Sequence, residues 1–120
     1  MKVAFSASGP ALESALDPRF GRAKVFLVVD TETGATEAVD NAQNADAVQG
    51  AGIQAAQTVA RALVQAVVTG HCGPKAFRVL AAAGIKVFQT DAATVGEALE
   101  QYRSGRLQEA VGADVEGHWA

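Results

Sequence analysis

Short apolar runs separated by turn residues predict five β-strands along the chain. In the first run Val3 and Phe5 fall on one face, and the second run is apolar and β-branched throughout, as in a strongly buried strand. Thr33 and Gly34 supply a turn between the second and third runs, so these two form a hairpin. The predicted strands span residues 2–7, 24–30, 35–40, 66–69 and 85–88.

Apolar residues at helical spacing predict three helices, which start at about residues 52, 74 and 94. The first runs to about residue 65. Pro74 suits the first position of the second helix, and Gly84 ends it. Thr94 and Glu97 have the spacing of a capping box for the third helix, which closes at Gly105.

This order of elements predicts an α/β fold built on a five-stranded mixed sheet flanked by helices. The last two strands enclose one helix and are therefore expected to be parallel with a right-handed crossover. We expect the sheet order 3-2-1-4-5, with strand 2 antiparallel. Residues 1–107 then form a single α/β domain, and residues 108–120 a loosely ordered C-terminal tail.

The predicted topology gathers four loops at one edge of the sheet. If strands 1, 3, 4 and 5 point the same way, their carboxyl ends release residues 8–23, 41–52, 70–74 and 89–94 at that edge. Ligands of open α/β sheets bind in the crevice at the carboxyl ends of the strands. The functional site is therefore expected among these loops.

Composition restricts the class of protein. The chain has 120 residues, the size of one domain, and a net charge of −3, which does not favour nucleic acid as a partner. No apolar run approaches the ~20 residues of a membrane-spanning helix. Cys72 is the single cysteine, so there is no disulfide framework. Together these features predict a cytoplasmic protein that binds neither membrane nor nucleic acid.

The distribution of charge indicates a basic crevice within this acidic chain. No acidic residue occurs between Asp46 and Asp91 or between Asp17 and Asp30. These two stretches contribute loops to the expected site edge, and their cations are Arg19, Arg22, Lys24, Arg61, Lys75, Arg78 and Lys86. An anionic ligand is therefore expected there.

The glycine-rich segment from Gly50 to Ala55 matches the dinucleotide fingerprint in spacing only. That fingerprint needs a strand directly before it and an acidic residue about 20 residues later. Polar residues precede Gly50 here, and no acid follows before Asp91. The main-chain N–H groups at Gly50, Gly52 and Ile53 nevertheless open a helix and are expected to help hold an anion.

A second loop, Gly70-His71-Cys72-Gly73-Pro74-Lys75, connects a predicted strand to a predicted helix. Cys72 and Arg78 have the Cys-x5-Arg spacing of cysteine-dependent phosphatases, in which a thiolate attacks phosphorus. Pro74 lacks one of the amides that such a loop uses, and Val79 stands where Ser or Thr is common, so we disfavour that chemistry. The remaining amides and Lys75 still predict an anion site, with Cys72 as a candidate soft metal ligand.

The first loop carries Arg19-Phe20-Gly21-Arg22, two cations around an aromatic residue. One interpretation places Phe20 in the core and both arginines in solvent. The lack of acidic neighbours favours the other, in which these residues contact the ligand rather than form a surface ion pair.

A series of short motifs runs from Met1 to about Leu107. In order they are Met1-Lys2-Val3-Ala4, Asp17 with Phe20-Gly21-Arg22, Asn41 or Asn44, Gly50 and Gly52, Val68, Gly70-x-x-Gly73, Ala76, Leu80, Gly84-Ile85-x-Val87, Thr94-Val95 with Glu97-Ala98-Leu99, and Gly105-x-Leu107. Their order and spacing resemble the dinitrogenase iron–molybdenum cofactor biosynthesis family, and His71-Cys72 resembles its orange-protein branch.

The resemblance implies a ribonuclease-H-like three-layer fold without nuclease chemistry. It implies a non-enzymatic carrier that holds a molybdenum-containing sulfide cluster without covalent attachment, either a mixed molybdenum–copper sulfide or a precursor of the iron–molybdenum cofactor. Cluster-assembly or ATPase proteins are the implied partners. A phosphatase using Cys72 and Arg78, or a module that binds a small anion or a partner protein, are the alternatives.

Overall fold

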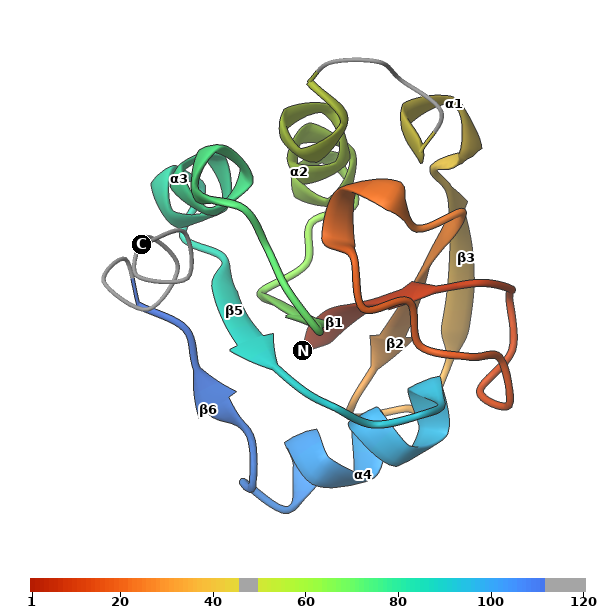
Figure 1. Ribbon diagram of the computed structural model, residues 1–120. Coiled ribbons are helices and arrows are strands. Elements are labelled where there is room, and N and C mark those ends of the chain that lie inside the picture. Colours follow the sequence, from red (N-terminus) through yellow and green to blue (C-terminus); the bar gives the residue numbers. More distant parts are fainter. Residues whose placement is uncertain (46–49, 112–120) are drawn as a thin grey trace.

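A mixed β-sheet with helices on both faces forms the computed structural model, which describes residues 1–45 and 50–111 (Figure 1). Neighbouring strands in the sheet follow the order β3-β2-β1-β4-β5-β6. β1 is antiparallel to β2 and parallel to β4, and β5 is parallel to β4. The strands are β1 (Lys2–Ala7), β2 (Val25–Asp30), β3 (Thr36–Asp40), β4 (Ala66–Thr69), β5 (Lys86–Gln89) and β6 (Gln108–Glu109).

The helices make this a three-layer arrangement. α2 and α3 cover one face of the sheet and α4 covers the other (Figure 1). None of the described helices is long and apolar enough to cross a membrane. The helical elements are the 3-10 turn η1 (Phe20–Arg22), α1 (Ala42–Ala45), α2 (Ala51–Arg61), α3 (Pro74–Ala82) and α4 (Val95–Arg103).

The predicted order of the first five strands is confirmed, but the prediction of five strands is wrong. Gln108 and Glu109 pair antiparallel with β5 and form a sixth strand at the edge of the sheet. Two exposed polar residues carry no apolar alternation, so no sequence pattern marked this strand. Ala110 packs into the core, so the segment expected to be a loose tail from residue 108 begins as part of the sheet. Residues 112–120, including His118, lie outside the described residues.

Two apolar cores lie on the two faces of the sheet because side chains alternate along each strand. Phe26, Val28 and Val67 point to the α2 and α3 side, where they pack with Val59 and Leu80. The opposite face, with Val3, Phe5, Leu27, Val29 and Val68, is covered by Val95, Ala98 and Leu99 of α4. The central strands are thus buried on both sides, as their continuous apolar character predicts.

One helix boundary differs from the prediction, and one short helix was not predicted. α2 ends at Arg61, before the predicted residue 65, and Leu63 adopts the left-handed conformation with φ of 62° and an exposed fraction of 72%. α1 lies within the segment predicted to be a polar loop, residues 41–49, of which 46–49 are outside the described residues.

The carboxyl ends of β1 and β4 are joined by a close contact between their loops. The Phe20 N–H donates to the His71 carbonyl at 3.1 Å, and the His71 N–H donates to the Pro18 carbonyl at 2.7 Å. A Cβ atom at Gly70 would lie 2.7 Å from Pro18 Cα and 2.8 Å from the Pro18 carbonyl oxygen. Glycine at position 70 is therefore needed for this approach.

We expect Gly70→Ala to destabilise the protein by about 1–3 kcal/mol, because the added methyl forces two backbone segments apart. Gly73→Ala is the matched control, since a Cβ there would meet nothing within 4 Å. It should change the free energy of unfolding by less than about 0.5 kcal/mol. Urea denaturation followed by circular dichroism measures both, and equal stability of the two variants would contradict the contact.

Candidate functional site

A cavity of about 710 Å³ lies at the carboxyl edge of the sheet, between η1 and the first turns of α2 and α3. Its size is within the range of small-molecule sites. The lining residues are Phe20, Gly21, Gly50, Ala51, Gly52, Ile53, Gly73, Pro74, Lys75 and Ala76. The cavity therefore forms where the topology predicted a ligand.

Two helix N-termini open onto this cavity, and neither has a side-chain cap. The first helical bonds are Gln54 N–H to Gly50 O in α2 and Phe77 N–H to Gly73 O in α3, both at 2.9 Å. Earlier N–H groups, those of residues 51–53, 75 and 76, therefore have no acceptor inside their helix. Neither first turn contains an acidic residue. Both N-termini are thus available to a negatively charged ligand.

α4, on the far side of the sheet, provides an internal contrast. Its N-cap Thr94 accepts a hydrogen bond from Glu97 N–H at 3.2 Å, and the Glu97 carboxylate accepts one from Ala93 N–H at 3.1 Å. The predicted Thr94 cap with Glu97 at capping-box spacing is therefore confirmed, with the Glu97 carboxylate bonded to the N–H of the residue before the cap. The chain caps the helix that does not line the site and leaves two helices that line it uncapped.

The cavity lining combines positive potential with apolar contact. Lys75 is exposed and is the one charged side chain among the described lining residues. Ile53 and Pro74 supply apolar surface, whereas Phe20 borders the cavity with a side chain that is 2% exposed and lies in the core against Phe26, with ring centroids 5.1 Å apart. This set of groups suits a bulky anion whose surface is only weakly hydrated.

Small residues bring the three walls into direct contact. A Cβ at Gly21 would lie 2.9 Å from Gly52 N and Cα, so η1 and α2 touch through their backbones. A Cβ at Gly52 would lie 3.3 Å from Ala76 Cβ, which brings α2 against α3. A larger side chain at either glycine would alter the cavity.

The structure brings most of the predicted site residues together. Seven line the cavity, namely Phe20, Gly50, Gly52, Ile53, Gly73, Pro74 and Lys75, whereas Arg19, Arg22, Gly70, His71 and Cys72 do not. Gly21, Ala51 and Ala76 also line it, although they were not predicted. Gly21 belongs to a motif that the family resemblance includes, and Ala51 lies between two predicted residues, but small side chains alone did not mark them as site residues.

Both arginines of the first loop interact with other residues of the protein. Arg19 Nε lies 3.4 Å from Asp17 Oδ1, and the Arg19 side chain is 70% exposed. The expectation that Arg19 avoids a surface ion pair is therefore wrong, because Asp17 borders the acid-free stretch and its carboxylate folds back over the loop. Arg22 Nη1 donates to the Ala45 carbonyl at 3.0 Å.

Gly70 and His71 hold the loop rather than line the cavity. Gly70 permits the close approach of Pro18, and the His71 backbone bonds to residues 18 and 20 on either side of Arg19. The His71 side chain is half-buried. These residues therefore position η1, which is one wall of the cavity.

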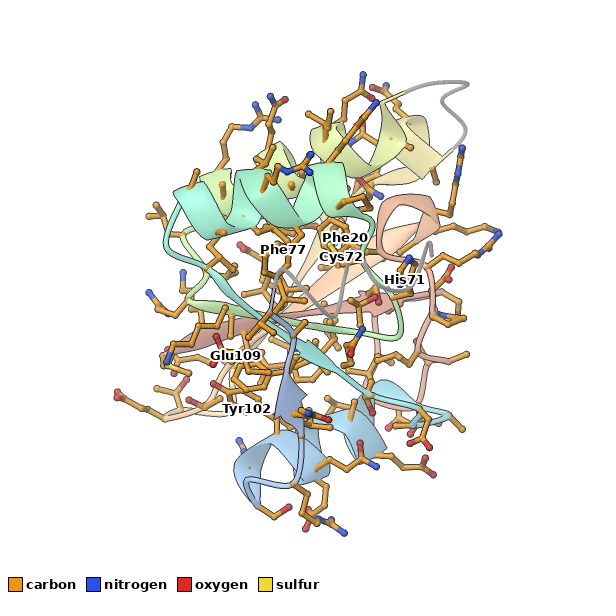
Figure 2. All side chains as sticks on the ribbon, turned by 60° about the vertical axis from the view of Figure 1, so that its left-hand side comes forward. Phe20, His71, Cys72, Phe77, Tyr102 and Glu109 are labelled. Carbon is orange, nitrogen blue, oxygen red and sulfur yellow. The ribbon has the colours of Figure 1, made fainter. Side chains whose placement is uncertain are left out.

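Cys72 is buried in the core between α3 and the sheet (Figure 2). Its side chain is 1% exposed, and Sγ lies 3.7 Å from the Gly73 carbonyl oxygen. Burial raises the pKa of the Cys72 thiol from 9.0 to about 12, so the thiol keeps its proton at neutral pH although it lies just before the N-terminus of α3. Since the thiolate is both the nucleophile and the metal-binding form, this placement counts against phosphatase chemistry and against Cys72 as a metal ligand.

Within residues 1–45 and 50–111, no group of three or more His, Cys, Asp and Glu side chains is arranged to hold a metal ion. The chemistry that the described site does offer is hydrogen-bond donation by main-chain amides, one ammonium group and apolar contact.

The raised pKa of Cys72 predicts a loss of stability in alkali. Above pH 9 the thiol ionises in the unfolded chain, whereas the folded chain keeps the proton until about pH 12. The free energy of unfolding should therefore fall between these values, by at most about 1.4 kcal/mol per pH unit. Cys72→Ala removes this contribution, so urea denaturation between pH 9 and about 11 should give a shallower decline than in the wild type. Equal slopes would show that the thiol is accessible.

Comparisons with known proteins agree with one another. The family model described as dinitrogenase iron-molybdenum cofactor matches residues 1–105. The apo orange protein from Desulfovibrio gigas is 46% identical, with a TM-score of 0.89 over 92% of this chain and 93% of that one. A NifB-like Thermotoga protein is 38% identical, with a TM-score of 0.79 over 90% and 91%. An uncharacterized protein from Methanocaldococcus jannaschii is 28% identical over 110 residues, 90% of each chain.

Proposed function

Because the chain belongs to the dinitrogenase iron–molybdenum cofactor family, we propose that it is a carrier for an anionic, molybdenum-containing metal–sulfur cluster held without a covalent bond. The family and the similar structures support a cofactor-binding or carrier role. The cluster is the cargo of this protein, and the cavity between η1, α2 and α3 is its binding site.

The observation that carries this proposal is the convergence of two uncapped helix N-termini and Lys75 on one cavity. A sulfide cluster is bulky and spreads its negative charge over several sulfur atoms. Main-chain N–H groups from two directions match such a surface, because each donates to a different part of it. Ile53 and Pro74 line the cavity with apolar surface suited to the weakly hydrated sulfides.

The identity of the metals is a narrower proposal than the carrier role. The resemblance of His71-Cys72 to the orange-protein branch implies a mixed molybdenum–copper sulfide, and the family description supports a precursor of the iron–molybdenum cofactor as the alternative. We further propose a cytoplasmic location, cluster-assembly or ATPase proteins as partners, and a ribonuclease-H-like classification of the three-layer fold. A phosphatase role is disfavoured by the buried thiol of Cys72.

Reconstitution tests the proposal directly. The purified protein is mixed with tetrathiomolybdate and copper, desalted, and measured for visible absorbance and metal content. We expect the wild type to retain the cluster and Lys75→Gln to bind it about 3- to 10-fold more weakly, because a cation at the cavity is lost. Lys86→Gln is the matched control, since Lys86 is exposed on β5 and does not line the cavity. Absence of protein-bound metal in the wild type would refute the carrier function, and equal weakening by both variants would place the site elsewhere.

A side chain that caps α3 should stabilise the fold and at the same time weaken binding of the cluster. Gly73 has extended N-cap dihedrals, φ −66° and ψ 163°, and room for a side chain. Gly73→Asp is expected to stabilise the fold by about 0.5–1 kcal/mol, because the carboxylate accepts from the free amides of the first turn. The same carboxylate repels the cluster, so affinity should fall at least about 10-fold.

Two further variants at position 73 separate the effect of the charge from the effects of the added side chain and of the cap. Gly73→Ala adds a methyl without charge or cap, and Gly73→Asn adds a neutral cap. Affinity should follow the order Ala, Asn, Asp from strongest to weakest, measured by titration of cluster absorbance. Wild-type affinity in Gly73→Asp would show that the amides of α3 do not contact the cargo.

A further inference from the structure

Three side chains behind the cavity connect two of its walls, and we call Asn41, Asn44 and Thr58 the brace. Asn41 Nδ2 donates to the Ala23 carbonyl at 2.7 Å. Asn44 Nδ2 lies 2.8 Å from Asn41 Oδ1 and 3.2 Å from Thr58 Oγ1. Thr58 Oγ1 in turn donates to the Gln54 carbonyl at 3.0 Å. The hydrogen bonds run without interruption from the residue after η1 to the first turns of α2.

The same two walls also meet on the cavity side. There Gly21 lies against the backbone of Gly52, with no space for a Cβ atom between them. η1 and α2 are therefore held at two places, by backbone contact beside the cavity and by the brace behind it. Two separate points of attachment restrict both the distance between the walls and their relative rotation.

Arg22 contributes to this connection. Its Nη1 donates to the Ala45 carbonyl at 3.0 Å, and the Ala45 N–H donates to the Asn41 carbonyl at 2.9 Å. The guanidinium thus links η1 to α1, the short helix that carries Asn44. Arg22, which the sequence marked as a cluster contact, has a positioning role in this arrangement.

Because the brace is wholly or partly buried, its polar groups must keep their hydrogen-bond partners. Asn41 is 2% exposed, and Asn44 and Thr58 are half-buried. A buried polar group that loses its partner is destabilised by the full desolvation of that group, so the network favours one arrangement of its members. The walls are therefore held at one spacing rather than a range of spacings.

We infer that the brace sets the spacing between η1 and α2 and thereby controls how long the cargo stays bound. The inference rests on the proposed carrier function, because it concerns release from the same cavity. Amide donors hold an anion only when they lie within hydrogen-bond distance, and a site loosened by about 1 Å loses them. Loosening the brace opens the cavity without removing any group that touches the cargo.

The test compares two variants that break the brace with one that keeps its hydroxyl. Thr58→Val loses the brace bond, Thr58→Ser keeps it, and Asn44→Ala removes the link to Asn41. We expect Thr58→Val and Asn44→Ala to release a molybdenum–copper sulfide cluster roughly 5- to 10-fold faster, the effect of one or two lost hydrogen bonds. Thr58→Ser should release it at the wild-type rate. Timed desalting of loaded protein with absorbance measures the rate.

Thr90→Val is the matched control. Thr90 Oγ1 donates to Gln101 Oε1 at 2.6 Å on the α4 side, so the variant loses a comparable bond that does not connect the cavity walls. Its release rate should equal that of the wild type even if urea denaturation shows similar destabilisation. Equal release rates in Thr58→Val and Thr90→Val would overturn the inference.

Hydrogen exchange of the unloaded protein tests the brace without cargo. The Phe20 and Gln54 amides report on η1 and α2, since each donates to a backbone carbonyl. They should exchange faster in Thr58→Val and Asn44→Ala than in Thr90→Val, and unchanged exchange would overturn the inference. If the wild type takes up no cluster, the carrier function fails, and exchange at these two amides alone decides whether the brace holds the walls.

Discussion

The parallel pairing of β1 with β4 is the interaction on which the site depends. Val3, Ala4 and Phe5 pair with Ala66, Val67 and Val68, and all six side chains are buried. This pairing joins the N-terminal hairpin to the helical half of the chain and aligns the carboxyl ends of the two strands. The loop after β1 then bonds to the loop after β4, and η1 comes to rest against the first turn of α2. Without this register, the cavity walls would have no common edge.

The helix N-termini differ in whether a side chain caps them. α4 has a capping box, whereas α2 and α3 begin at glycine and leave their first amides to the cavity. A side-chain cap contributes about 0.5–2 kcal/mol, so the two uncapped helices forgo stabilisation that the same chain uses elsewhere. Residues that break a local rule of stability are expected at functional sites. Gly73 fits this expectation, because its dihedrals admit a side chain and a capping side chain there would compete with an anionic ligand for the same N–H groups. Gly50 has a φ of 76°, a left-handed conformation that by itself favours glycine.

The sequence predicted elements and loops well, and predicted side-chain directions poorly. The five longer strands and the capping box of α4 could be identified because apolar period and cap spacing are local properties. β6 has two polar residues and is defined only by its pairing with β5. The direction of Cys72 into the core and the pairing of Arg19 with Asp17 depend on tertiary packing, so motif spacing did not reveal them. Glycines 50, 52 and 73 were predicted as site residues because their backbone, rather than a side chain, supplies the contact.

A site built mainly from backbone donors has consequences for a carrier. Amide N–H groups form no bond to metal that must be broken, so cargo leaves without ligand exchange at the protein. They also keep their partial charge at any pH, so affinity is set by geometry and by ionic strength. Holding and releasing cargo then depend on the distance between the walls that carry the donors. In the arrangement that we propose, the network of Asn41, Asn44 and Thr58 between η1 and α2 controls that distance, and Cys72 contributes to the core against which α3 packs.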